Sequence, residues 1–256
     1  MKQWKLKALA AALAVAVVGP AHALIADSVS GNGELFFTIY DNVTQTSYTR
    51  DLGLTIDNFV TAAGGTTVNL PASFTVAADS TLTTFLGGFS LAQQGTLLWN
   101  IGAMDGVGLE RYLTTALSMP GPSGSAAVMT NSSLKLLDAA DQFTSLTNAL
   151  GTHPGTLATN GSNTASAAND GLAFGGSGLW GNNWGGKANF NTTQNGLGSS
   201  NNFWLLFQNG TANLNRSFYA SAGTFTLESD GDLVFGTLSA VPVPAAVWLL
   251  GSGLVG

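Results

Sequence analysis

Few side chains in this sequence suit acid–base or nucleophilic chemistry. Cysteine is absent and the two histidines are His22 and His153, so thiolate nucleophiles and thiolate metal sites are excluded. A Ser-His-Asp triad would have to use His153, and no Gly-x-Ser-x-Gly motif accompanies it. We interpret His153, in Gly-Thr-His-Pro-Gly, as a loop residue just beyond the end of a helix.

Carboxylates offer a second kind of chemistry, because glycoside hydrolysis uses two of them across a cleft. Several candidates fall at predicted strand ends or turns, where Asp commonly bonds its own backbone. A hydrolase is therefore the third of three hypotheses. The candidates are Asp51, Asp57, Asp105, Glu110, Asp138 and Asp141.

Glu228, Asp230 and Asp232 surround a predicted turn and could offer oxygens to calcium. The turn lacks the longer Asp-x-Asp-x-Asp-Gly loop with a distal Glu. Asp-Gly is also favoured in hairpin turns without any metal. The hairpin explanation is the stronger one, and we predict no cofactor.

Aromatic and amide side chains are interleaved between residues 180 and 204. Sugar C–H faces stack on aromatic rings while amides bond sugar hydroxyls, so this mixture is typical of carbohydrate-binding surfaces. The alternative is that the rings fill the core beneath a Gly-rich loop. The residues concerned are Trp180, Asn182, Asn183, Trp184 and Trp204.

The end of the chain carries a family resemblance. Val241-Pro242-Val243-Pro244-Ala245, followed by Ala-Val-Trp-Leu-Leu-Gly-Ser-Gly-Leu, resembles the sorting signal of PEP-CTERM proteins in its Val-Pro-Leu-Pro-Ala variant. Family members continue with a membrane helix and a basic cluster. We interpret 241–256 as the motif and the first part of that helix, without the basic cluster.

This resemblance implies processing rather than a particular chemistry. It implies an exosortase-type partner, cleavage near Pro242 to Pro244, and transient contact with the inner membrane of a Gram-negative bacterium. The processed protein would then reside at the cell surface or outside the cell.

The N-terminal residues predict export as well. A basic start with Lys2, Lys5 and Lys7, an apolar run and Ala21-His22-Ala23 form a signal-peptide pattern, with cleavage before Leu24. Removing 1–23 leaves five basic residues against 14 acidic ones, a net charge of −9. The remaining cations are scattered, which argues against a nucleic-acid partner.

Charged residues make up only 9% of the chain, far below the roughly 25% of an average soluble protein. A polar but weakly charged surface resists self-association poorly. The leading hypothesis is therefore a non-enzymatic surface or extracellular-matrix protein, associated with biofilm or exopolysaccharide or with copies of itself. A secreted carbohydrate-binding module is the alternative.

The remaining pattern predicts one mainly-β domain over 24–240, with antiparallel sheets in a sandwich. A Gly/Asn/Ser-rich region at 156–202 is expected to lie over the sheet as an ordered loop or irregular strands. An amphipathic helix is predicted over about 132–150 and a short helix over about 79–86. Predicted strands cover 34–40, 47–52, 54–59, 67–76, 96–102, 109–115, 203–208, 216–220, 224–228 and 232–236.

Overall fold

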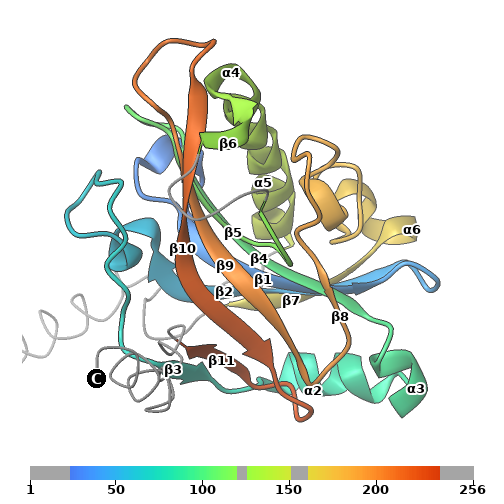
Figure 1. The fold of residues 1–256 in the computed structure, drawn as a ribbon. Helices are drawn as coiled ribbons and strands as arrows, with labels where there is room; N and C mark the ends of the chain where they lie inside the picture. The colour runs from blue at the N-terminus through green and yellow to red at the C-terminus, as the bar shows by residue number, and fades with distance from the viewer. Residues whose placement is uncertain (1–23, 120–125, 151–160, 237–256) are drawn as a thin grey trace, which may run out of the picture.

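The computed structural model describes residues 24–119, 126–150 and 161–236. The predicted signal peptide, His153 and the sorting motif lie outside these residues. The described strands form one antiparallel sheet in the order β3-β11-β10-β9-β5-β4-β1-β2-β7, and β6 and β8 pair with β10 and β4 beside this path (Figure 1). The strands are β1 Glu34–Asp41, β2 Thr46–Thr55, β3 Phe74–Val76, β4 Leu98–Asp105, β5 Arg111–Thr115, β6 Ala126–Thr130, β7 Ser162–Ser166, β8 Gln194–Asn195, β9 Ser199–Phe207, β10 Arg216–Leu227 and β11 Leu233–Gly236.

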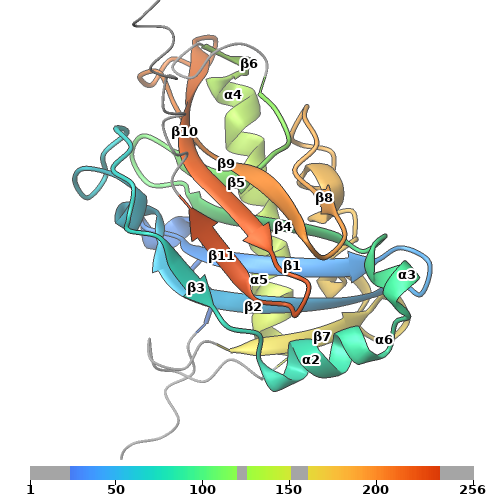
Figure 2. The same cartoon turned by 60° about the horizontal axis from the view of Figure 1, so that its bottom comes forward.

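The mainly-β class is confirmed, but the predicted sandwich is wrong. β1 pairs with both β2 and β4, and β5 pairs with both β4 and β9. These pairings join the hairpins edge to edge in one sheet instead of placing them in two layers. The sheet twists strongly and curls into a half-barrel (Figures 1 and 2).

The predicted long helix is confirmed as a continuous helical segment with a tighter middle turn. It runs through α4 (Asn131–Leu134), η3 (Lys135–Ala140) and α5 (Asp141–Ala149). Thr130 caps its start, since its side chain accepts a hydrogen bond from the Ser133 N–H. The segment covers one face of the sheet where a sandwich would place its second sheet (Figure 1).

The predicted short helix is confirmed as α2 (Ser80–Gly87), and the Asp79 carboxylate caps it by accepting from the Leu82 N–H at 2.7 Å. None of the helices in the described ranges is long and apolar enough to cross a membrane. The remaining short helices are η1 Ser28–Ser30, η2 Ile56–Phe59, α3 Leu91–Gln94, α6 Ala167–Asp170, η4 Gly171–Ala173 and η5 Gly181–Asn183.

Each face of the sheet has its own hydrophobic core. Inside the half-barrel, Phe37, Trp99 and Phe203 pack with residues of η2 and α2. On the outer face, Phe36 and Leu206 pack against the long helical segment and the 173–190 region. Side chains alternate between the two faces along each strand, which lets one sheet support both cores.

Two strand predictions hold only in part. Region 67–76 forms only β3, after an isolated Val60–Val68 bridge. Region 54–59 divides between the end of β2 and η2. The hairpin predicted at 224–236 is confirmed as β10–β11. Over the described part of 156–202 the chain lies on the sheet as short elements, and one of them, β7, pairs with β2 as an added strand.

Candidate functional site

The two tryptophans predicted for sugar stacking lie in the core. Trp180 and Trp184 are 0% and 1% exposed. The Trp180 indole N–H donates to Asn100 Oδ1 at 2.8 Å, and the Trp184 indole N–H donates to Thr114 Oγ1 at 3.1 Å. Both rings lie against Gly102 of β4, where a Cβ atom would collide with Trp180. The core-packing alternative therefore describes these two rings.

The predicted amide residues remain near the surface. Asn182, Asn183 and Asn191 line a shallow depression of about 320 Å³ together with Phe190. Two of the amides are used locally, because Asn183 Oδ1 accepts from the Gly186 N–H and Asn191 Oδ1 accepts from the Thr193 N–H. This depression has amides without a stacking tryptophan.

Trp204 has different hydrogen-bond and ring partners from those of Trp180 and Trp184. It is half-buried on β9, stacks edge-on with Tyr219 at 5.7 Å and donates its indole N–H to the Ala116 carbonyl at 3.1 Å. These contacts fix the ring within the outer face of the sheet. Trp180, Trp184 and Trp204 therefore form no shared platform with the amides of the depression.

The predicted calcium candidates make turn contacts. Asp230 Oδ1 accepts from the Asp232 N–H at 3.1 Å, and Asp232 Oδ1 accepts from the Ala78 N–H at 2.8 Å. Glu228 closes the turn through backbone hydrogen bonds to Asp232 and Gly231. Within the described residues, no group of three or more His, Asp or Glu side chains is placed to hold a metal ion. These contacts match the hairpin alternative.

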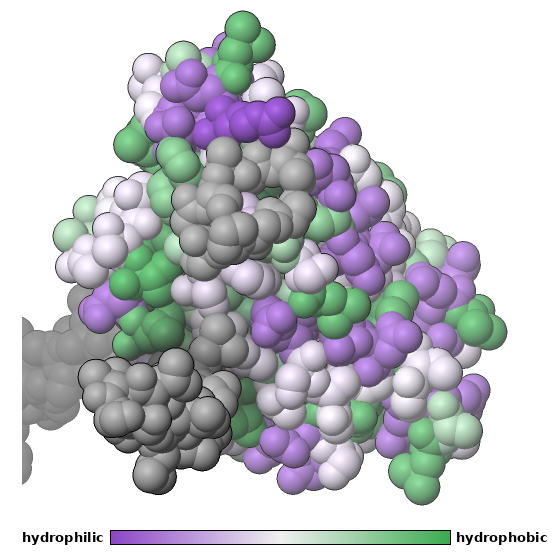
Figure 3. Space-filling model, viewed as in Figure 1, coloured by the Kyte–Doolittle hydropathy of each residue, from purple (hydrophilic) through white to green (hydrophobic). Residues whose placement is uncertain are grey.

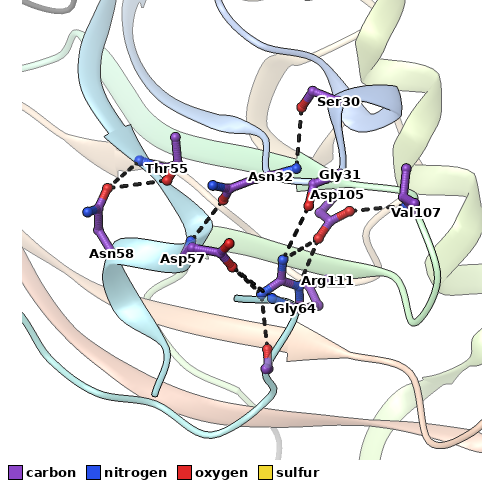
Figure 4. Close-up of polar contacts among 11 residues, drawn as sticks. Ser30, Gly31, Asn32, Thr55, Asp57, Asn58, Gly64, Asp105, Val107 and Arg111 are labelled. Atoms are coloured by element: carbon purple, nitrogen blue, oxygen red, sulfur yellow. Dashed lines mark hydrogen bonds and ion pairs between the residues drawn. The ribbon is translucent and has the colours of Figure 1, made fainter. Parts of the chain in front are cut away.

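The carboxylates considered for hydrolysis gather at one end of the sheet, beginning with a buried cluster on Arg111. The Arg111 side chain is fully buried; its Nε donates to Asp105 Oδ2 at 2.8 Å and its Nη1 to Asp57 Oδ1 at 2.8 Å (Figure 4). Nη1 also bonds the Gly65 carbonyl at 3.0 Å and Nη2 reaches the Gly31 carbonyl at 3.5 Å. The guanidinium thus occupies the space that a substrate would need between Asp57 and Asp105.

A second set of carboxylates lies beside the Arg111 cluster, with Asp138 and Asp141 on the long helical segment and Glu110 just before β5. The Tyr112 hydroxyl donates to Asp138 Oδ1 at 2.7 Å and lies 3.2 Å from Glu110 Oε2, while Lys135 Nζ is 3.1 Å from Glu110 Oε1. Burial, together with the negative charges of Glu110 and Asp141, raises the pKa of Asp138 to about 6 against the opposing Tyr112 hydrogen bond. Burial also raises the pKa of Asp141, which accepts hydrogen bonds from Ser28.

A third pair, Glu34 and Asp51, joins β1 to β2. Both residues are buried, at 6% and 1% exposure. Burial above all, and then the hydrogen bond and the negative charge of Asp51, raise the pKa of Glu34 to about 8. At neutral pH Glu34 therefore keeps its proton and donates a hydrogen bond to Asp51, whose Oδ1 also accepts from the Gly53 N–H at 2.7 Å. The sequence analysis missed Glu34 because it begins a predicted strand.

A groove at the other end of these strands was not predicted. Its volume is about 480 Å³, and Phe85 and Phe89 form one wall. Hydroxyl side chains at the start of β2 and the end of β7 form the opposite wall. The four-residue spacing of the two phenylalanines at the end of α2 is the one signal in the sequence that could have indicated it.

Comparison with known proteins adds no family assignment. No protein-family model matches the chain, and neither a curated protein nor a solved structure shows a significant similarity to it. The site residues therefore have to be interpreted from their own geometry.

Proposed function

We propose that this protein is an exported, non-enzymatic component of the cell surface or extracellular matrix, processed through a C-terminal sorting signal. The observation that carries the proposal is the resemblance of Val241-Pro-Val-Pro-Ala245 to PEP-CTERM signals, at the opposite end from a signal-peptide pattern. An exosortase-type enzyme, transient contact with the inner membrane, and association with exopolysaccharide or other copies of the chain are part of the proposal.

The fold around the predicted signal cleavage site supports export. Leu24, the expected first residue after Ala21-His22-Ala23, is 56% exposed, whereas Ile25 is buried. Ile25 is fixed to the long helical segment, because its N–H donates to Asn148 Oδ1 at 3.0 Å and its carbonyl accepts from Asn148 Nδ2 at 3.1 Å. A cut before Leu24 would therefore leave the two Ile25–Asn148 hydrogen bonds in place.

The carboxylate end supports the non-enzymatic part of the proposal. Asp57 and Asp105 are bound to one guanidinium, and protonated Glu34 is hydrogen-bonded to Asp51. These bonds join chain segments and engage the Asp57, Asp105, Glu34 and Asp51 carboxyl groups with one another or with Arg111, whereas a glycoside hydrolase needs two carboxyl groups across an open cleft. On the face drawn in Figure 3 hydrophilic and hydrophobic residues are interspersed, in keeping with a surface of low charge.

The test is cell fractionation in a Gram-negative host with and without an exosortase. In the host with the enzyme, wild type should be processed and recovered from the surface or medium, while the Pro242→Ala/Pro244→Ala double variant should accumulate as a longer form in the inner membrane. Pro71→Ala, a proline of the described domain, is the matched control and should fractionate as wild type. Identical processing of wild type and the double variant would overturn the proposal.

A further inference from the structure

The groove between α2 and β7 has one aromatic wall. Phe85 and Phe89 are both half-buried, and their ring centroids are 5.1 Å apart with an interplanar angle of 61°. Phe85 also contacts Tyr48 of β2 at 6.5 Å between centroids, so it is supported from behind by the inner core. Figure 2 shows α2 beside β7, with α6 nearby. The rings therefore offer fixed apolar edges and faces to a molecule in the groove.

The opposite wall is a row of hydroxyls. Thr46 and Ser166 are direct partners across the β2–β7 pair, and Thr164 is the partner of Tyr48. Because alternate residues of a strand share a face, these three side chains lie on the same side of the sheet as Tyr48, which is the side of α2. Thr44 Oγ1 lies 2.8 Å from Thr46 Oγ1 and donates to Asp41. The hydroxyls are thus held in order before any ligand arrives.

The groove is almost neutral. Asp170 is the one charged residue in its lining, and its Oδ2 already accepts from the Ser166 N–H at 2.8 Å. Arg50 and Asp79, farther along the same face, lie 4.0 Å apart as an ion pair. An anionic ligand would therefore find no cationic side chain in the lining, and a cationic ligand would find only Asp170. Thr46 and Ser166 already have hydrogen bonds, to Thr44 and to the Asn169 N–H. A purely apolar ligand would cover the Thr164 hydroxyl and the spare hydrogen-bonding capacity of the other two without replacing their bonds to water, which is costly.

The sheet edge beside the groove adds backbone donors and acceptors. The Asp51 N–H donates to the Gly161 carbonyl and the Ala167 N–H donates to the Gln45 carbonyl. The backbone N–H and C=O groups of the odd-numbered residues of β7 therefore point toward β2. In an antiparallel pair the alternate residues point the other way. The backbone N–H and C=O of Ser162 and Thr164 are thus directed to the outer edge, where no strand of the described ranges pairs with them.

We propose that this groove binds a segment of a neutral polysaccharide, with Phe85 and Phe89 stacking on sugar faces and Thr46, Thr164 and Ser166 bonding sugar hydroxyls. A sugar ring has an apolar C–H face and a rim of hydroxyls, the same combination that the two walls present. The volume of about 480 Å³ lies within the roughly 300–1,000 Å³ of small-molecule sites. The proposal rests on the exopolysaccharide association in the proposed function and deepens it, because it names the groove and the chemical class of polysaccharide.

The test is affinity electrophoresis of the purified mature protein through gels containing dextran, galactomannan or hydroxyethylcellulose, with anionic alginate as a fourth probe. We expect retardation by at least one neutral polysaccharide and about a tenfold loss of affinity in Phe89→Ala. Thr164→Ala should weaken retention by a smaller factor. Two controls at exposed positions outside the lining, Leu91→Ala on α3 and Thr83→Ala on the outward face of α2, should bind as wild type.

Phe89→Leu keeps most of the apolar volume and removes the aromatic face, so it covers the case in which Phe89→Ala fails to fold. Retardation that Phe89→Leu or Thr164→Ala leaves unchanged, retention by alginate alone, or no retention by any of the three neutral polysaccharides would overturn the proposal. Binding is measured on purified protein, so its failure would leave the fractionation result of the sorting tail unaffected.

Discussion

The two ends of strands β1 and β2 use polar residues in opposite ways. Where β1 starts, buried carboxylates and Arg111 bond one another and close the space between them. Where β2 starts, uncharged hydroxyls face two phenylalanines across an open groove. Burying a charge without a partner is costly. The buried charges at the start of β1 are paired with one another, and these pairs join neighbouring loops. At the groove the one charged residue of the lining, Asp170, accepts a backbone hydrogen bond, and the other lining residues are uncharged.

The largest effect should come from breaking the charged end. Arg111→Ala leaves Asp105 buried without its cation, so we expect a loss of about 3–5 kcal/mol in the free energy of unfolding. Lys135→Ala removes the half-exposed partner of the buried Glu110 carboxylate. It is the comparison variant and should cost less, about 1–2 kcal/mol. Urea denaturation of both variants checks this. Equal losses would mean that the Arg111 cluster stabilises the fold no more than the half-exposed Lys135–Glu110 pair does.

A smaller effect should appear as pH dependence. Since the raised pKa of Glu34, about 8 against its ordinary 4.5, makes the folded state hold a proton that the unfolded state releases, stability should fall as pH rises from about 4.5 to about 8. Between about pH 6 and 8 the fall should come mainly from Glu34. Asp138 adds to the fall only up to about its own pKa of 6. Glu34→Gln keeps a hydrogen-bond donor to Asp51 without a titrating proton. It should remove most of the decrease in Tm across this range.

The matched control for this measurement is Glu228→Gln, on the exposed turn between β10 and β11. It should keep the wild-type slope of Tm against pH. A slope that is the same in wild type and Glu34→Gln would show that the Glu34–Asp51 proton does not control it.

The smallest effect on stability should come from the groove. Thr164 is exposed, so Thr164→Ala should change the free energy of unfolding by no more than about 0.5 kcal/mol. Thr115→Ala is a matched substitution in the core, because the buried Thr115 hydroxyl donates to the Thr192 carbonyl at 2.7 Å and accepts from the Ile101 N–H at 3.0 Å. It should cost about 1–3 kcal/mol. Thermal denaturation compares the two, and a large loss in Thr164→Ala would make the groove wall a structural element.

Local patterns predicted the elements better than their assembly. The short helix at about 79–86, the long helix and the Asp-Gly hairpin each depend on residues close in sequence, and each is confirmed. The single sheet depends on the pairing of β1 with β4 and of β5 with β9, between segments far apart in the chain. β7 was missed as a separate strand because Ser-Asn-Thr-Ala-Ser has no apolar alternation and is extended by pairing with β2.

The candidate site was hidden for the same reason. The aromatic and amide mixture at 180–204 was visible in the sequence, but a glycine at position 102 of another strand admits Trp180 and Trp184 to the core. In the groove, Phe85 faces Thr164 only because α2 packs across β2 and β7. Glu34 meets Asp51 through the register of β1 on β2, in which Phe36 is the partner of Asp51.

The Arg111 cluster also sets how the molecule can fluctuate. One guanidinium reaches Gly31 before β1, Asp57 and Gly65 around η2, and Asp105 at the end of β4. Lifting any one of these loops into solvent would strip the cation of a partner while the others still hold it in the interior. The loops therefore belong to one cooperative opening unit, and their amide protons should exchange with solvent at a shared rate.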